Sequence, residues 1–178
     1  GSVVKEFEYS VATKASGHTK QQLYTILKSI IESHYSDRSE SVVFDKGRVW
    51  SASIIIETME KSIGDVKIVA TVRPIAECIA SLYTIENKQL PIKHWVRESY
   101  LMEHFMFAYN ALKDGYEKHP ENFCIVEYDN LCNNTQRELD RIADFIGVPH
   151  VTFSPAIQQV DENDNAWNIK DLHKLEPE

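Results

Sequence analysis

The sequence has few of the residues that break up or cross-link a fold. Glycine and proline number six each in 178 residues, which excludes collagen-like and linker-rich chains. The cysteines Cys78, Cys124 and Cys132 are too few and too odd in number for a disulfide framework, and none forms a Cys-x-x-Cys metal pair. We therefore expect a protein of a reducing compartment, the cytoplasm, with no bound metal.

Long hydrophobic runs and a basic surplus are also missing. No stretch approaches the roughly 20 apolar residues of a membrane span, and no basic segment followed by an apolar one opens the chain. The net charge is −8, and its acidic surplus falls in residues 90–178, which argues against non-specific nucleic-acid binding. We expect neither a membrane nor a nucleic-acid partner. A small anionic ligand stays open, because it needs only a few cations.

The remaining composition is typical of a globular protein. Hydrophobic residues make up 43% and charged residues 26% of the chain. Folding of a chain of this length should bury roughly 70% of the unfolded surface, so a hydrophobic core is available. Gly1 and Ser2 have the form of a tag remnant, and we expect a single domain over residues 3–178.

Hydrophobic periodicity predicts helices that alternate with short buried strands. Helices are expected at 19–35, 51–63, 74–83, 93–113 and 135–146, and strands at 42–44, 67–72 and 123–127. Thr19–Gln22 and Thr135–Glu138 have the form of capping boxes, while Gly115 and Gly147 should end the helices before them. This order favours a three-layer α/β domain with a central parallel sheet, whose ligands bind at the carboxyl ends of the strands.

The first expected strand runs into a charged turn. Asp45, Lys46 and Arg48 follow it within four residues, and Gly47 would let the backbone approach a ligand. Lys46 and Arg48 could face an anion while Asp45 orients them or accepts a proton. A solvated turn with no ligand is the alternative.

Two further strand ends carry candidate ligand-binding side chains. Arg73 lies between a strand and a helix, where its donors could act together with the helix N-terminus, and Ser81 follows two turns later. Tyr128 follows the third strand and could stack on a base or hydrogen-bond a ligand. In the alternative interpretation Arg73 pairs with a neighbouring acid, Ser81 is an ordinary helix residue and Tyr128 belongs to the core.

In their order and spacing these segments resemble the sulfotransferase family that uses 3′-phosphoadenosine 5′-phosphosulfate (PAPS). The resemblance lies in KIVATVRPIAECIASLY, in HPENFCIVEYDNLCNNTQRELDRIADFIGVP and in VVFDKGRVW, and it covers about residues 40–175. The closing WNIKDLHKL resembles the C-terminal segment of microbial and phage-type members. The resemblance implies a three-layer, P-loop-NTPase-like α/β fold and sulfuryl transfer from PAPS to a hydroxyl or amine of a small-molecule or carbohydrate acceptor.

The resemblance also implies roles for individual residues. Arg73 and Ser81 would hold the 3′-phosphate of PAPS, and Lys46 would stabilise charge on the departing phosphate oxygen. Tyr128 would lie near the nucleotide, and Lys174 could replace part of the Arg-Lys-Gly lid found in other members. Sulfuryl transfer depends on in-line positioning, charge stabilisation and a base for the acceptor proton. Asp45 is the candidate base, with His94, His104 and His173 as rivals.

One part of the family pattern is missing. Members open with a strand and a loop of the type G-x-P-R-S-G-T-T that cradles the 5′-phosphosulfate, and the closest stretch here, residues 15–20, lacks that form. We expect that an N-terminal segment has been lost; a degenerate member is the alternative. Two other classes stay open: an NTP-binding domain, although the Walker motif is missing, and a non-enzymatic interaction domain with Tyr100, Phe107 and Tyr116 as partner surface.

Overall fold

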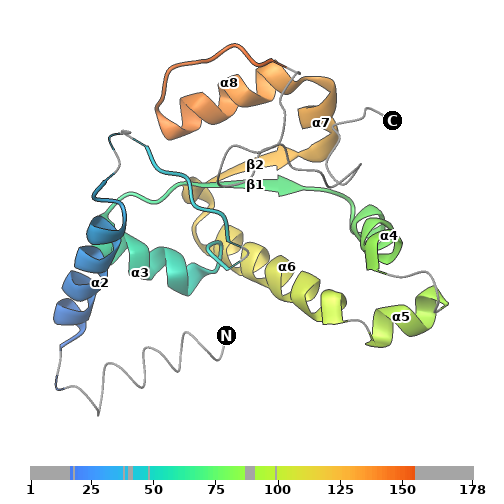
Figure 1. The fold of residues 1–178 in the computed structure, drawn as a ribbon, viewed down its shortest axis with the longest axis horizontal. Helices are drawn as coiled ribbons and strands as arrows, with labels where there is room; N and C mark the ends of the chain where they lie inside the picture. Colours follow the sequence, from blue (N-terminus) through green and yellow to red (C-terminus); the bar gives the residue numbers. More distant parts are fainter. Residues whose placement is uncertain are drawn as a thin grey trace. The chain divides into compact units, whose positions relative to one another are not determined.

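The computed structural model describes residues 17, 19–37, 39, 42–47, 49–86, 91–98 and 100–154. These residues form a mixed α/β structure with seven α-helices and a two-stranded sheet (Figure 1). They fall into two compact units. Unit 1 holds the described residues up to 68 together with 82–123, and unit 2 holds 69–81 together with the described residues from 124 onward.

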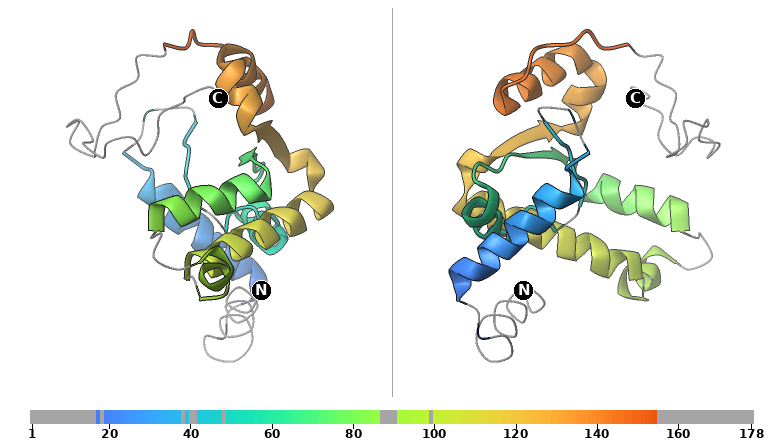
Figure 2. Two further views of the ribbon diagram at one scale, coloured as in Figure 1. Left: turned by 90° about the vertical axis from the view of Figure 1, so that its right-hand side faces the viewer. Right: turned by 60° about the vertical axis from the view of Figure 1, so that its left-hand side comes forward.

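Unit 1 is built around helix α3 (Ser53–Ile63), which contacts both α2 (Lys20–His34) and α6 (Tyr100–Lys118), as Figures 1 and 2 show. The predicted capping box at the start of α2 is confirmed. The Thr19 hydroxyl accepts a hydrogen bond from the Gln22 backbone N–H at 3.2 Å, and the Gln22 side chain accepts one from the Thr19 N–H at 2.7 Å. Such a pair satisfies two of the N–H groups that a helix start leaves without partners.

The helix expected at 93–113 is two helices, α5 (Ile92–Glu98) and α6. The expectation that Gly115 ends it is wrong, because α6 continues to Lys118 and Gly115 is buried within it. A Cβ atom at position 115 would overlap the Ser51 carbonyl oxygen and lie 3.1 Å from the Phe123 ring. The glycine therefore permits close packing rather than helix termination.

The buried apolar side chains described in unit 1 come from α3, α5, α6 and the start of β2. Ile56 is fully buried, and the other buried apolar residues of this unit are Trp95, Met102, Ala111 and Phe123. Trp95 packs edge-on against Tyr83, with ring centroids 5.5 Å apart.

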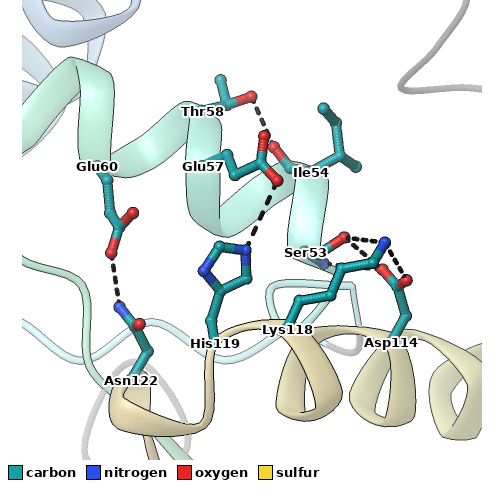
Figure 3. A network of polar contacts seen from close by, with 9 residues as sticks. All are labelled: Ser53, Ile54, Glu57, Thr58, Glu60, Asp114, Lys118, His119 and Asn122. Atoms are coloured by element: carbon teal, nitrogen blue, oxygen red, sulfur yellow. Dashed lines mark hydrogen bonds and ion pairs between the residues drawn. The ribbon is translucent and has the colours of Figure 1, made fainter.

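Polar contacts fasten α6 to the first turn of α3 (Figure 3). The Asp114 carboxylate accepts hydrogen bonds from the Ser53 backbone N–H at 3.1 Å and from its hydroxyl at 2.5 Å. Lys118 reaches Asp114 at 2.6 Å and the Ser53 hydroxyl at 3.1 Å. Since Ala52, the N-cap of α3, supplies no side-chain hydrogen bond, Asp114 caps this helix from another element.

Unit 2 contains the sheet. Strands β1 (Ile68–Val72) and β2 (Phe123–Glu127) lie side by side and parallel, which confirms the strands expected at 67–72 and 123–127. Helix α4 (Ile75–Glu86) follows β1, and α7 (Tyr128–Asn133) and α8 (Thr135–Ile146) follow β2. Because the strands are parallel, both run into their helices at the same edge of the sheet (Figure 1).

Helix α8 is fixed to β2 by Arg141. Its guanidinium donates to the Ile125 carbonyl oxygen at 2.7 Å, lies 3.3 Å from the Cys124 sulfur, and pairs with buried Glu138 at 2.6 Å. The capping box expected at Thr135–Glu138 is therefore wrong. Thr135 donates its hydroxyl hydrogen to the Leu131 carbonyl oxygen instead, and Glu138 is used by Arg141. Gly147 ends α8 as expected, with a left-handed φ of 78°.

The strand expected at 42–44 is not formed. Residues 42–47 form no regular secondary structure, and the Phe44 side chain is 71% exposed. Three consecutive apolar residues indicate a buried strand only when a neighbouring strand supplies hydrogen bonds, and within the described chain β1 and β2 pair only with each other. Among the described helices, none has the length and apolar character required to cross a membrane.

Candidate functional site

Arg73 and Tyr128 meet at the carboxyl edge of the sheet. Arg73 is the first residue after β1 and Tyr128 the first after β2. The Arg73 guanidinium lies over the Tyr128 ring, 4.7 Å from its centroid, in a cation–π contact. The parallel strands thus bring together two residues that lie 55 positions apart in the sequence, as the strand-end argument predicted.

Glu77, in the first turn of α4, also binds Arg73. Its carboxylate accepts a hydrogen bond from the Arg73 Nε–H at 2.6 Å. This bond is the main cause that raises the pKa of Arg73 above its ordinary value. Arg73 therefore pairs with a neighbouring acid, as the alternative interpretation expected. It also lies just before the N-terminus of α4.

Two thiols flank this pair. The Cys78 sulfur lies 3.8 Å from the Arg73 carbonyl oxygen, and burial is the main cause that raises the pKa of its thiol. Cys132 lies beside the Tyr128 hydroxyl and raises the pKa of that phenol above its ordinary value. The Cys78 thiol and the Tyr128 phenol thus stay protonated at neutral pH, so the positive charge of this site comes from Arg73 and the N-terminus of α4.

Ser81 lies on α4 in the same unit as Arg73, two turns beyond the first residue of the helix, and is exposed. It is available to a ligand. Whether it contributes to the same site as Arg73 remains a prediction from the sequence.

Asp45 and Lys46 lie in unit 1, on the irregular segment 42–47, and both are exposed. The Asp45 carboxylate accepts a hydrogen bond from the Tyr35 hydroxyl at 3.2 Å. The rival bases His94 and His104 lie on α5 and α6 of the same unit.

The remaining predicted residues, Arg48, Lys174 and His173, lie outside the described part of the chain.

Glu77, Cys78 and Cys132 were not among the residues predicted for this site. Glu77 could have been found, because it follows Arg73 by four residues and side chains at that spacing meet on one face of a helix. Cys132 is likewise four residues after Tyr128. Glu77 was overlooked because Arg73 precedes α4, so the two residues do not fall within one predicted helix.

The arrangement suits an anion. A guanidinium at a strand end, directly before a helix of 12 residues, adds its donors to the N–H groups that the first helical turn leaves without partners. No cluster of three or more His, Cys, Asp or Glu side chains able to hold a metal ion occurs among the described residues.

A sequence profile of the sulfotransferase family matches residues 19–152. The match includes Lys46, Arg73 and Tyr128 and the whole of the two-stranded sheet. Comparison with curated proteins finds no match, and neither does comparison with solved structures. The family has a P-loop-like α/β fold, in agreement with the alternating helices and parallel strands seen here. Because the profile spans about three quarters of its length, the chain belongs to the sulfotransferase family.

Proposed function

We propose that this protein transfers a sulfuryl group from PAPS to a hydroxyl or amine of an acceptor molecule. Membership of the sulfotransferase family supports sulfuryl transfer in general. The observation that carries the choice of donor is the position of Arg73, which lies between β1 and the N-terminus of α4 with its guanidinium over Tyr128. Such a site favours a phosphate group, and PAPS carries one at its 3′ position.

In this proposal Arg73 binds the 3′-phosphate of PAPS. The guanidinium offers several N–H donors in one plane, which match the oxygens of a phosphate, and the N-terminus of α4 adds favourable partial charge. Ser81, exposed on the same helix, would contribute a hydroxyl. Tyr128 would hold the Arg73 guanidinium through the cation–π contact.

The reaction itself follows from the charges that develop. The acceptor oxygen or nitrogen attacks sulfur, its bond to sulfur forms as the bond between sulfur and the 5′-phosphate oxygen breaks, and adenosine 3′,5′-bisphosphate leaves. Lys46 would stabilise the negative charge on that leaving oxygen. Asp45 would accept the acceptor's proton, with the Tyr35 hydroxyl holding the carboxylate at 3.2 Å.

Calorimetric titration with adenosine 3′,5′-bisphosphate tests the donor site. Wild-type protein should bind it more tightly than adenosine 5′-phosphate, which lacks the 3′-phosphate. Arg73→Ala should weaken binding about 10- to 100-fold, the range expected for lost hydrogen bonds to a charged group. Arg137→Ala, which removes an exposed arginine on α8, is the matched control and should bind like wild type.

Absence of binding by the wild type, or equal binding by Arg73→Ala, would contradict the donor assignment. Turnover is tested separately, by following release of adenosine 3′,5′-bisphosphate from PAPS with phenol, sugar and amine acceptors. Tight binding without release on any acceptor would contradict the catalytic part of the proposal and favour a nucleotide-binding role.

A further inference from the structure

We propose that Glu77 and Tyr128 are positioning residues that fix the Arg73 guanidinium before a phosphate arrives. This inference rests on the proposed function, in which Arg73 binds the 3′-phosphate. It assigns a role to an acidic residue that would at first be expected to oppose an anionic ligand.

The two contacts engage different atoms of the guanidinium. Glu77 accepts the Nε–H bond at 2.6 Å and thereby holds one edge of the guanidinium plane. The central carbon of the guanidinium lies over the Tyr128 ring, 4.7 Å from its centroid. One contact engages Nε and the other engages the central carbon, so rotation about the last bonds of the side chain is restricted by both.

Both supports come from rigid elements that begin at the edge of the sheet. Glu77 is in the first turn of α4, and Tyr128 is the first residue of α7, directly after β2. The Arg73 side chain is 29% exposed and that of Glu77 is 39% exposed, so neighbouring residues cover most of the surface of both. The backbone therefore sets the orientation of the guanidinium through two neighbours.

Restricting Arg73 in advance should raise its affinity for a phosphate. A free arginine side chain loses roughly 2 kcal/mol of rotamer entropy when it is immobilised, and groups ordered before binding do not incur that cost at binding. The negative charge of Glu77 acts in the opposite direction, because it repels a phosphate. Geometry and charge thus have opposite effects on affinity, and substitution can separate them.

Glu77→Gln and Glu77→Ala make that separation. The glutamine keeps an oxygen that accepts the Nε–H bond but removes the charge, so adenosine 3′,5′-bisphosphate should bind at least as tightly as to wild type. The alanine removes both, and the loss of positioning should weaken binding about fivefold to tenfold. If Glu77 only stabilised the N-terminus of α4, both substitutions would lower thermal stability by similar amounts. Their affinities for the bisphosphate would then not differ.

Tyr128 is tested by the shape of its replacement. Tyr128→Phe keeps the aromatic face and should bind the bisphosphate within about twofold of wild type. Tyr128→Leu removes the face, and binding should weaken about twofold to fivefold, the range of an exposed cation–π contact.

A spectroscopic signature reports the fixing of Arg73 without any ligand. The Arg73 Nε–H should give a nitrogen-correlated NMR signal, assigned by its loss in Arg73→Lys, that exchanges slowly with water. The signal should persist in Glu77→Gln and disappear or exchange rapidly in Glu77→Ala. These results together would establish Glu77 as a positioning residue.

Three results would overturn the inference. Tighter binding by Glu77→Ala than by Glu77→Gln would make Glu77 a competitor of the phosphate. Unchanged affinity in Glu77→Ala and Tyr128→Leu would show that neither residue positions Arg73. An Nε–H signal that is the same in all Glu77 variants would show that the guanidinium is not fixed by this carboxylate. A wild type that binds no bisphosphate would overturn the proposed function instead, while the NMR signal would still decide whether Arg73 is fixed.

Discussion

The Asp114 carboxylate joins α6 to the first turn of α3 through charged hydrogen bonds. Its bonds to Lys118 and to the Ser53 hydroxyl and N–H lower its pKa from 3.8 to about 2. The side chain is 42% exposed, so solvent screens much of this interaction, and a contribution of about 1 kcal/mol to stability is the appropriate scale. Asp114 therefore contributes moderately to the stability of the contact between α6 and the start of α3.

Asp114→Asn should lower the free energy of unfolding by about 1 kcal/mol at pH 7, because the amide cannot replace the charged contacts. A carboxylate with a depressed folded-state pKa stabilises the fold above its unfolded pKa of 3.8 and loses that effect as pH falls through about 2. Urea unfolding between pH 7 and pH 2 measures this. The difference between wild type and Asp114→Asn should stay constant down to about pH 4 and then shrink; a constant difference down to pH 2 would contradict it.

His150 should stabilise the segment after α8 in the opposite pH direction. Its ring nitrogen lies 2.8 Å from the Asp144 carboxylate, which raises the pKa of His150 above 6.5. A histidine with a raised folded-state pKa contributes fully below its unfolded pKa, and the contribution is lost as pH rises through the folded pKa. Proton NMR titration, with His150→Gln for assignment, should show a midpoint above 6.5.

Asp144→Asn is the matched control, because it removes the charge but keeps the size of the side chain. It should return the His150 midpoint toward 6.5. A wild-type midpoint at or below 6.5, or one that Asp144→Asn leaves unchanged, would contradict the assignment.

Sequence reasoning at this scale succeeds where the partners are local or are placed by a strand end. Arg73 and Tyr128 could be predicted because parallel strands present their carboxyl ends at one edge. The partnership of Asp114 with Ser53 could not be predicted, since 61 residues separate them and only the packing of α3 on α6 brings them together. The role of Lys46 stays a prediction.

At the scale of secondary structure, α6 depends on a residue that usually ends helices. Gly115 lies inside α6, where the Ser51 backbone and the Phe123 ring approach too closely for a Cβ atom. Sequence alone favours termination at this position, because glycine is the poorest helix former apart from proline. The contact partners that outweigh this propensity are distant in the chain and therefore could not be anticipated.

Gly115→Ala should destabilise the protein by about 1–3 kcal/mol, the cost of overpacking a close contact, even though alanine favours helices. Asn110→Ala, at an exposed position of the same helix, is the matched control and should be neutral or slightly stabilising. Chemical unfolding of both variants measures the difference. If Gly115→Ala were more stable than wild type, the Ser51 backbone could shift away from the new Cβ atom without loss of stability, which would contradict the prediction.

The segment 42–47 illustrates the limit of short apolar runs. Val42–Phe44 has the composition of a strand, but strand formation depends on a neighbouring ladder, and none forms here in the described part of the chain. By contrast, residues 68–72 and 123–127 pair with each other in the sheet, and both strands are correctly predicted. Pairing, rather than propensity, decides which apolar segments become strands.

At the scale of the whole molecule, burial is unevenly distributed. Helix α2 has no buried residue, while β2 includes Phe123, Cys124 and Val126, all at least nine-tenths buried. Amide exchange depends on how readily a segment opens, and segments with few buried apolar contacts open most easily. The stability of this protein should therefore rise from α2 toward β2.

Hydrogen exchange followed by mass spectrometry should detect this gradient. Peptides covering residues 20–34 should exchange at least about tenfold faster than those covering 123–127, although both are hydrogen-bonded. Asp114→Asn should accelerate exchange in α3 more than in β2. Equal protection of α2 and β2 would contradict a gradient set by burial.

All three thiols of the chain belong to unit 2, and they differ in burial. Cys124 is 4% exposed beneath Arg141, whereas Cys78 and Cys132 are half-buried beside Arg73 and Tyr128. An alkylating reagent would therefore modify Cys78 and Cys132 ahead of Cys124, and the lag would time the opening of the β2–α8 interface. The rates of thiol alkylation thus follow local opening within unit 2 without any amino-acid substitution.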